Sequence, residues 1–151
     1  MLIKSEQEAI FLACEMESAA VHLYERAMLV MQQLGREGEE LYLQISLMLA
    51  DEQEHLRQFR ALYTGLDASI EQQLSLSAIA DGILFEGGLM GAVRQGLLTD
   101  VDSMLKAAIL AEAASAKKYR EFAELTTNPE AKSALLLIAA EEDKHLNHLV
   151  E

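Results

Sequence analysis

Cysteine is almost absent from this chain, in which Cys14 is the single example among 151 residues. One cysteine excludes an intrachain disulfide, and without a CxxC pair the chain has no cysteine-based metal centre such as a zinc ribbon. Runs of about 18 uninterrupted apolar residues, which a membrane-spanning helix needs, are also missing. The first residues, MLIKSEQEAI, lack the basic region and apolar run of a secretory signal. We therefore expect a cytoplasmic protein with no membrane partner.

Basic side chains are also scarce, because 12 Lys and Arg residues stand against 25 Asp and Glu residues and leave a net charge of −13. The few basic residues are scattered along the sequence rather than grouped in a stripe. Such a chain repels the phosphate backbone of nucleic acids, so we expect no nucleic-acid partner. The length suits one domain that spans 1–151.

Apolar residues recur with helical spacing in two pairs of long segments, and the members of each pair are joined by a short connection. Two short connections and one long one are typical of an all-α, antiparallel four-helix bundle with a crossover between its second and third helices. Capping signals at Ser5, Asp100 and Asn128 mark three of the helix starts. The long helices are expected at about 5–34, 39–64, 101–127 and 129–150, with the crossover at 65–100.

The crossover differs in character, since between 79 and 98 it places several glycines among apolar residues. A structureless stretch of this length would be unusual in a compact domain, so we expect short helices at roughly 69–80 and 83–96. The glycines are expected to serve close packing, because neither a preceding strand nor a GxxxxGK[ST] motif supports a phosphate-binding loop. The apolar residues exceed what one small bundle needs to cover itself, which predicts a symmetric homodimer through this segment.

Two matching sets of residues repeat in the two halves of the chain. A solitary glutamate on the first helix of each half is followed by a Glu-x-x-His motif on the second helix. Residues three apart lie on one face of a helix, so the carboxylate and the imidazole of each motif can bind one metal ion. The repeat predicts a dinuclear metal site with six ligands: Glu17, Glu52, His55, Glu112, Glu142 and His145.

The donor types indicate which metal this site would take. Hard oxygen ligands with a single imidazole per ion favour iron or manganese over structural zinc, which usually takes Cys and His. Four carboxylates also balance two divalent ions in charge, which lowers the cost of burying the cluster. Surface charge is the simpler alternative for one Glu-x-x-His motif, but two copies in the same register favour metal binding.

Other residues lie close to the predicted ligands. Tyr24 and Tyr119 follow the solitary glutamates by seven residues and share their helix face. Their hydroxyls can reach a ligand carboxylate on the opposite hairpin, orient it and supply a proton or an electron; a core tyrosine with another acceptor is the alternative. Asp51 and Glu141 precede the motifs and are expected at the surface. The alternative is that one of them holds the second nitrogen of a ligand histidine on a facing helix.

In its four long helices and six predicted ligands, the sequence resembles the ferritin-like di-iron carboxylate proteins. It is most similar to the rubrerythrin family and, in its ligand pattern, to the bacterioferritins. The resemblance implies a ferritin-like bundle that binds two iron ions. Glu52 and Glu142 would bridge the two ions, while Glu17 and Glu112 would each bind one.

The sequence differs from these families at several points, and the differences limit which cofactors and assemblies the resemblance implies. Rubrerythrins carry a further glutamate one turn after the third-helix ligand, where this chain has Ser115, and a rubredoxin-like domain that this sequence does not contain. Bacterioferritins bind haem through a methionine directly after the second-helix glutamate, where this chain has Gln53, so no haem is predicted. The sequence ends soon after His145 without the fifth helix that helps ferritins form shells, so no storage cage is expected.

The resemblance implies an oxidoreductase that reduces hydrogen peroxide or dioxygen while oxidising Fe(II), with electrons from an external donor. One alternative is an iron-binding or delivery protein that holds the metal without turnover. Another is a metal-free helical interaction module that has kept only the fold. The residues do not distinguish iron from manganese, or hydrogen peroxide from dioxygen.

Overall fold

The computed structural model describes residues 3–150, and within them the chain forms six α-helices and no strand. The all-α fold predicted from the sequence is therefore confirmed. The four long helices are α1 (Glu6–Gln33), α2 (Glu40–Leu62), α5 (Val101–Leu125) and α6 (Pro129–Val150). The crossover contains two short helices, α3 (Ala68–Ala80) and α4 (Gly88–Arg94).

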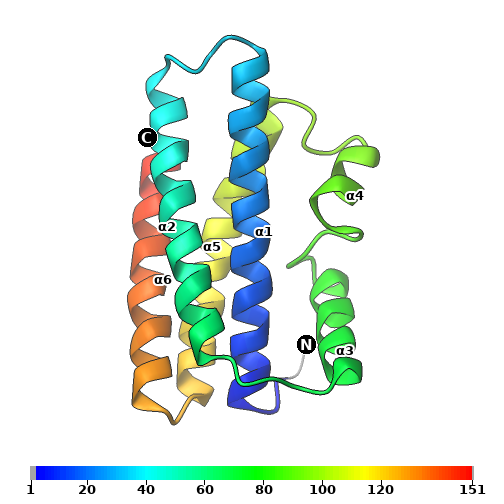
Figure 1. Ribbon diagram of the computed structural model, residues 1–151, viewed down its shortest axis with the longest axis vertical. Coiled ribbons are helices and arrows are strands. Elements are labelled where there is room, and N and C mark those ends of the chain that lie inside the picture. The colour runs from blue at the N-terminus through cyan, green and yellow to red at the C-terminus, as the bar shows by residue number, and fades with distance from the viewer. Residues whose placement is uncertain (1–2, 151) are drawn as a thin grey trace.

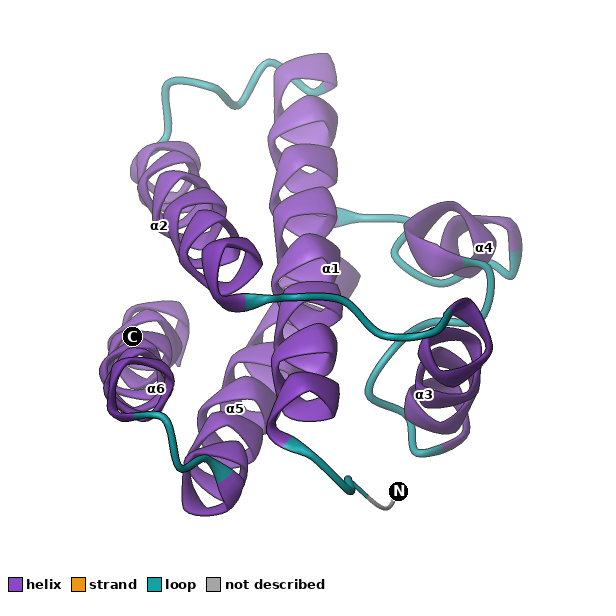
Figure 2. Ribbon diagram, turned by 60° about the horizontal axis from the view of Figure 1, so that its bottom comes forward, coloured by secondary structure: helices purple, strands orange, loops and turns teal. Residues whose placement is uncertain are grey.

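The long helices form two antiparallel hairpins, α1 with α2 and α5 with α6, which pack side by side (Figure 1). The crossover carries the chain from one end of the bundle back to the other, so α5 runs antiparallel to α1. Both crossover helices lie beside α1, on the side away from α2 and α6 (Figure 2). The crossover therefore packs against the outer side of α1.

Side chains that accept hydrogen bonds from free backbone N–H groups fix three of the helix starts. The Ser5 hydroxyl accepts from the N–H of Glu8 at 3.2 Å, and the Asp100 carboxylate accepts from the N–H of Ser103 at 2.7 Å. The Asn128 side chain accepts from the first turn of α6. Each bond satisfies a donor that the helix itself leaves unpaired, which sets where α1, α5 and α6 begin.

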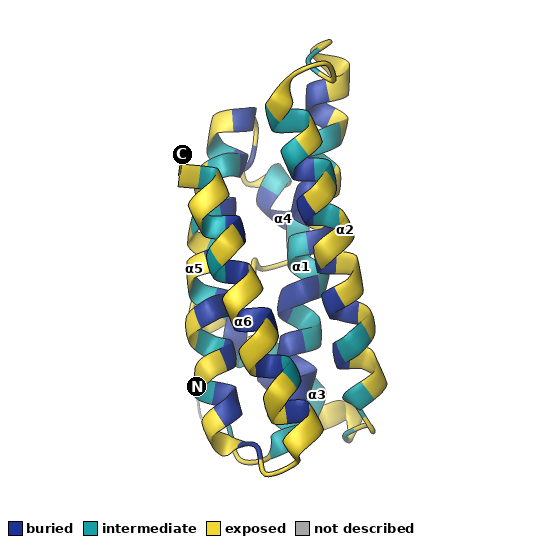
Figure 3. Ribbon diagram, turned by 90° about the vertical axis from the view of Figure 1, so that its left-hand side faces the viewer, coloured by how far each residue is buried: buried dark blue, intermediate teal, exposed yellow. Residues whose placement is uncertain are grey.

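Two apolar clusters fill the bundle, and a polar layer separates them. The first cluster contains Ile10, Phe59 and Leu135, and the second contains Leu23 and Ile45. On each long helix, a buried glutamate stands between residues that pack in the first cluster and residues that pack in the second. The buried positions form inward-facing stripes, with exposed residues on the outer faces (Figure 3). The polar layer is thus enclosed by apolar side chains at both ends.

The second crossover helix is shorter than predicted. Helix α4 spans only Gly88–Arg94, whereas the sequence pattern predicts 83–96. Gly82 and Gly87, with φ of +75° each, adopt the left-handed conformation before it. Because that conformation interrupts a right-handed helix, the apolar residues between these glycines lie in a non-helical loop instead.

Most of the crossover glycines serve turns rather than close packing, which corrects the expectation from the sequence. A Cβ added at Gly82, Gly88 or Gly96 would meet no atom within 4 Å, and each has a positive φ. Gly91 is different, because a Cβ there would lie 2.2 Å from the carbonyl oxygen of Glu86. Close backbone approach therefore requires glycine at this position.

The crossover covers one side of its own bundle. Leu74 and Ala78 of α3 are buried in the first apolar cluster, and Ala92 and Leu98 are buried in the second. A homodimer through this segment stays a prediction. Among the described residues, none of the helices combines the length and the apolar character needed to cross a bilayer.

Gly91→Ala is expected to lower the free energy of unfolding by about 1–3 kcal/mol, because the added methyl group would collide with the Glu86 carbonyl. Gly38→Ala is the control, since its Cβ has open space and its φ is not positive; stability should hold or rise by about 0.4–1 kcal/mol. Urea denaturation, combined with hydrogen exchange across the crossover, measures both effects. Equal stability of the two variants would contradict the tight contact.

Candidate metal centre

Each long helix presents one glutamate to the polar layer: Glu17 from α1, Glu52 from α2, Glu112 from α5 and Glu142 from α6. On α2 and α6 a histidine follows three residues later. It lies on the same helix face as the glutamate, because residues three apart share a face. The structure brings together all six residues that the sequence selects. Each is at most 4% exposed: Glu17, Glu52, His55, Glu112, Glu142 and His145.

The six side chains form two overlapping groups, and in each group four donor atoms lie within 4.8 Å of one another. The first group contains Glu17, Glu52, His55 and Glu142, and the second contains Glu52, Glu112, Glu142 and His145. Each group therefore takes three residues from one hairpin and one carboxylate from the other. A buried set of three carboxylates and one imidazole is suited to holding a metal ion.

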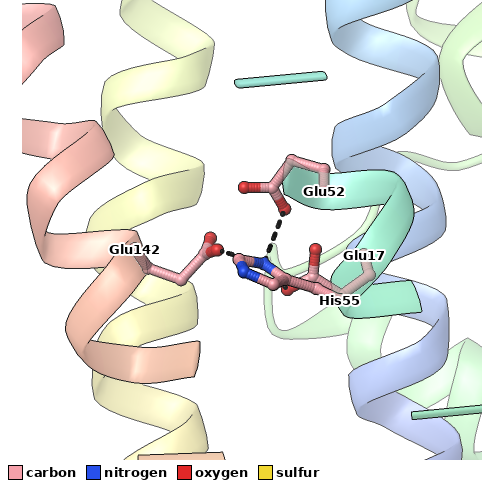
Figure 4. A group of neighbouring side chains, drawn as sticks. All are labelled: Glu17, Glu52, His55 and Glu142. Carbon is pink, nitrogen blue, oxygen red and sulfur yellow. Dashed lines mark ion pairs between the residues drawn. The ribbon is translucent and has the colours of Figure 1, made fainter. Parts of the chain in front are cut away.

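Both histidines direct the Nδ1 atom of the ring into the cluster. The Nδ1 of His55 lies 3.0 Å from Glu142, and the Nδ1 of His145 lies 2.8 Å from Glu52. Figure 4 shows the His55 ring between Glu52 on its own helix and Glu142 on α6. Each imidazole thus faces a carboxylate from the other hairpin.

The outer nitrogen of each histidine is held by a second carboxylate. The Nε2 of His145 lies 3.0 Å from Asp51, and the Nε2 of His55 contacts Glu141 in the same way. Asp51 and Glu141 are about half exposed, which agrees with a surface position, but both also make the contact that the sequence analysis treats as the alternative. A carboxylate on the outer nitrogen fixes the ring orientation and strengthens the inner nitrogen as a metal ligand.

Two buried tyrosines tie the hairpins together across the layer. The Tyr24 hydroxyl on α1 donates to Glu112 on α5, and the Tyr119 hydroxyl on α5 donates to Glu17 on α1 at 2.9 Å. Burial, together with the charge of nearby glutamates, raises the pKa of both phenols well above the ordinary value. Both hydroxyls therefore keep their protons and act as donors.

Several polar atoms of the cluster make no well-aligned hydrogen bond among the described residues, although the Nδ1 of His55 and a Glu142 oxygen lie within ion-pair distance. They belong to five of the six side chains: Glu17, Glu52, His55, Glu112 and Glu142. Leaving a buried polar atom without a partner costs about 1–3 kcal/mol, so such atoms are rare in folded proteins. A bound cation would be a partner for these carboxylate and imidazole atoms at once, so this donor set fits a metal centre.

The protein without metal must compensate this concentration of charge with protons. Burial, and then the charge of Glu52, raises the pKa of Glu17, while burial and the charge of Glu17 raise that of Glu142. Burial disfavours the charged histidines, but the surrounding glutamates outweigh it and raise the pKa of His55 to about 11 and of His145 to about 10. Burial also opposes the charge of Glu52, yet hydrogen bonding holds its pKa below the ordinary value.

Comparison with known proteins adds no relative. No protein-family model, curated protein or solved structure matches this chain. What the chain does must therefore be inferred from the cluster itself, which is buried, contains carboxylates and histidines, and is compatible with a di-iron site in a helical protein.

Metal binding is expected to release protons, raise the melting temperature and strengthen as the pH rises towards about 10. The sign follows from the raised pKa values, because His55 and His145 hold protons up to about pH 11 and 10 and must lose them to bind metal. Calorimetric titration in two buffers of different ionisation enthalpy counts the protons. Equal melting temperatures with and without metal, or no proton release, would count against a buried site.

Asp51→Asn and Glu141→Gln are expected to weaken metal binding by about 10–100-fold, because each removes the carboxylate that orients a histidine on the opposite hairpin. Asp143→Asn is the matched control, since Asp143 is also partly exposed on α6 but pairs with Arg120. Metal titration of the folded variants gives the affinities. If all three variants bind like the original chain, the outer carboxylates do not support the centre.

Proposed function

We propose that this chain is a ferritin-like, rubrerythrin-type di-iron oxidoreductase that reduces hydrogen peroxide or dioxygen while oxidising Fe(II). The observation that carries the proposal is that both donor groups contain Glu52 and Glu142. Ions held by the two groups would share these carboxylates and lie close together. Two-metal sites of this kind act on two oxygen atoms of one substrate.

The donor set supports iron as the metal. Each group offers three carboxylates and one imidazole, a set that suits iron or manganese. Two divalent ions would offset four carboxylates, which allows the cluster to stay buried at low cost. Iron is proposed because the reaction requires an ion that changes its oxidation state readily, and manganese is the alternative.

The balance of the reaction defines what the chain must supply. Reduction of one hydrogen peroxide to two water molecules consumes two protons and two electrons. Two Fe(II) ions held by the two donor groups would supply one electron each, and an external donor would restore Fe(II). Tyr24 and Tyr119 fix Glu112 and Glu17 through their hydroxyls and place a proton beside each carboxylate. Asp51 and its counterpart on α6 hold the imidazoles in one orientation.

The site is complete within one chain, since all six donors come from its two hairpins. A homodimer through the crossover therefore concerns assembly rather than chemistry. The partners that the proposal requires are an oxidant, either hydrogen peroxide or dioxygen, and an electron donor.

Glu52→Ala and Glu142→Ala are expected to abolish the paired site and nearly all turnover, because each carboxylate belongs to both donor groups. Glu17→Ala and Glu112→Ala should weaken mainly one ion, because each belongs to one group. Metal content per chain, measured beside the rate of Fe(II) oxidation by hydrogen peroxide, separates the two classes. Glu54→Ala is the control, because Glu54 is exposed and pairs with Arg57.

In the same assay, Tyr24→Phe and Tyr119→Phe should keep both ions and slow oxidation by about 10–100-fold, since only a supporting hydroxyl is lost. Two bound ions without steady-state peroxide consumption, in the presence of an artificial reductant, would instead identify an iron-binding or delivery protein. A chain that takes up no iron after anaerobic reconstitution would be a metal-free module. Full metal content and rate in Glu52→Ala and Glu142→Ala would refute the shared carboxylates.

A further inference from the structure

A large groove lies outside the polar layer, between the crossover and the pair α1 and α5. Its volume is about 960 Å³, within the range of small-molecule sites in proteins. None of the six residues of the candidate metal centre lines it. The groove is therefore a separate feature of the same bundle, lined by residues of α1, α5 and the crossover. Figures 1 and 2 show the crossover helices beside α1.

The groove has a floor of small side chains and an apolar outer wall. Ala19 and Ala20 of α1 and Ala111 and Ala114 of α5 contribute to the floor. The crossover contributes the wall with larger apolar residues, among them Ile79, Ile83, Leu84, Phe85, Leu89 and Leu97. Short floor side chains leave room for an occupant, and the apolar wall would gain free energy when an apolar occupant displaced water.

Positive charge gathers along this groove, although the whole chain carries a net charge of −13. Three of the six lysines in the sequence line it: Lys106, Lys117 and Lys118. Lys118 already pairs with Glu121 at 3.2 Å. Within residues 3–150, neither Lys106 nor Lys117 has an ion-pair partner, so both amines are free to pair with an anion.

The two free lysines stand towards opposite ends of the α5 segment that lines the groove. They are eleven residues apart, which is about 16 Å along a helix. Glu15 and Asp81 also line the groove, so its charge is placed at particular points rather than spread evenly. An occupant with one negative group and a long apolar body would match this pattern, with the body between the lysines.

We propose that the groove binds an amphipathic carboxylate, an unbranched aliphatic chain with a terminal carboxyl group, as in a long-chain fatty acid. The aliphatic chain lies against the alanine floor under the crossover. Its carboxylate pairs with Lys106 or Lys117 at one end of the groove. Apolar contact supplies most of the affinity, and the lysines select the negative head group.

Calorimetric titration of the full chain with decanoate, dodecanoate and tetradecanoate, below their micelle concentrations, tests the chain-length dependence. Each added methylene should tighten binding about three- to fourfold, at one ligand per chain. Dodecyltrimethylammonium is the charge control. Because an acidic protein attracts cations in general, tighter binding of dodecanoate would reveal the local effect of the lysines.

Two sets of variants locate the site. Ala114→Phe fills the groove and should weaken dodecanoate binding by about tenfold or more, whereas Ala113→Phe, at the adjacent exposed position that does not line the groove, should leave it unchanged. Replacing Lys106 and Lys117 together by glutamine should weaken binding about two- to fivefold. Replacing Lys4 and Lys132 together by glutamine, two exposed positions that do not line the groove, is the charge-matched control.

Three results would overturn the proposal: no binding at any chain length, equal affinity for the ammonium analogue, or equal loss in Ala113→Phe and Ala114→Phe. A chain that is dimeric in light scattering and becomes monomeric in Ala114→Phe would also overturn it, because a second copy would then occupy the groove. None of these measurements requires metal. Failure here therefore leaves the proposed di-iron function untouched, and failure of that function leaves the groove intact.

Discussion

Four carboxylates and two imidazoles share one buried layer, and the cost of burying that charge constrains the rest of the structure. Charged groups are stable away from water only when they are paired, protonated or bound to metal. In the protein alone, protons supply part of the compensation, as the raised pKa values of Glu17 and both cluster histidines indicate. The apolar clusters on either side supply the packing that holds the layer together. Metal ions would replace those protons and give the unsatisfied atoms their partners.

Much of the fold follows from the sequence, because long helices depend on local information. Apolar spacing and capping side chains such as Ser5 and Asp100 act within a few residues, so they mark each helix directly. The crossover was harder to predict. Glycine is selected both by left-handed turns, as at Gly82, and by tight contact, as at Gly91, and the sequence does not show which reason applies.

The candidate site likewise has a part that the sequence predicts and a part that it does not. The sequence predicts its six central residues, because a Glu-x-x-His spacing places both side chains on one helix face and the repeat supplies a second copy of the motif. The contacts of Asp51 and Glu141 are harder to predict from the sequence, because on their own helices these residues point away from the motif. Their contacts with His145 and His55 depend on how two hairpins are rotated against each other, which periodicity leaves open. The equivalent positions of the two residues in the repeat are the signal that could have identified these contacts.

Each donor group includes one carboxylate from the other hairpin, and this arrangement affects how the chain folds. Tyr24 and Glu112 are 88 positions apart, and Tyr119 and Glu17 are 102 apart, so the contacts that complete the layer form only after the crossover loop has closed. Each hairpin alone holds three members of a donor group and lacks the fourth. Because Glu142 completes one group and Glu52 the other, parting the hairpins would dismantle both groups in a single event. Metal retention would then report on docking of the two halves as one cooperative unit.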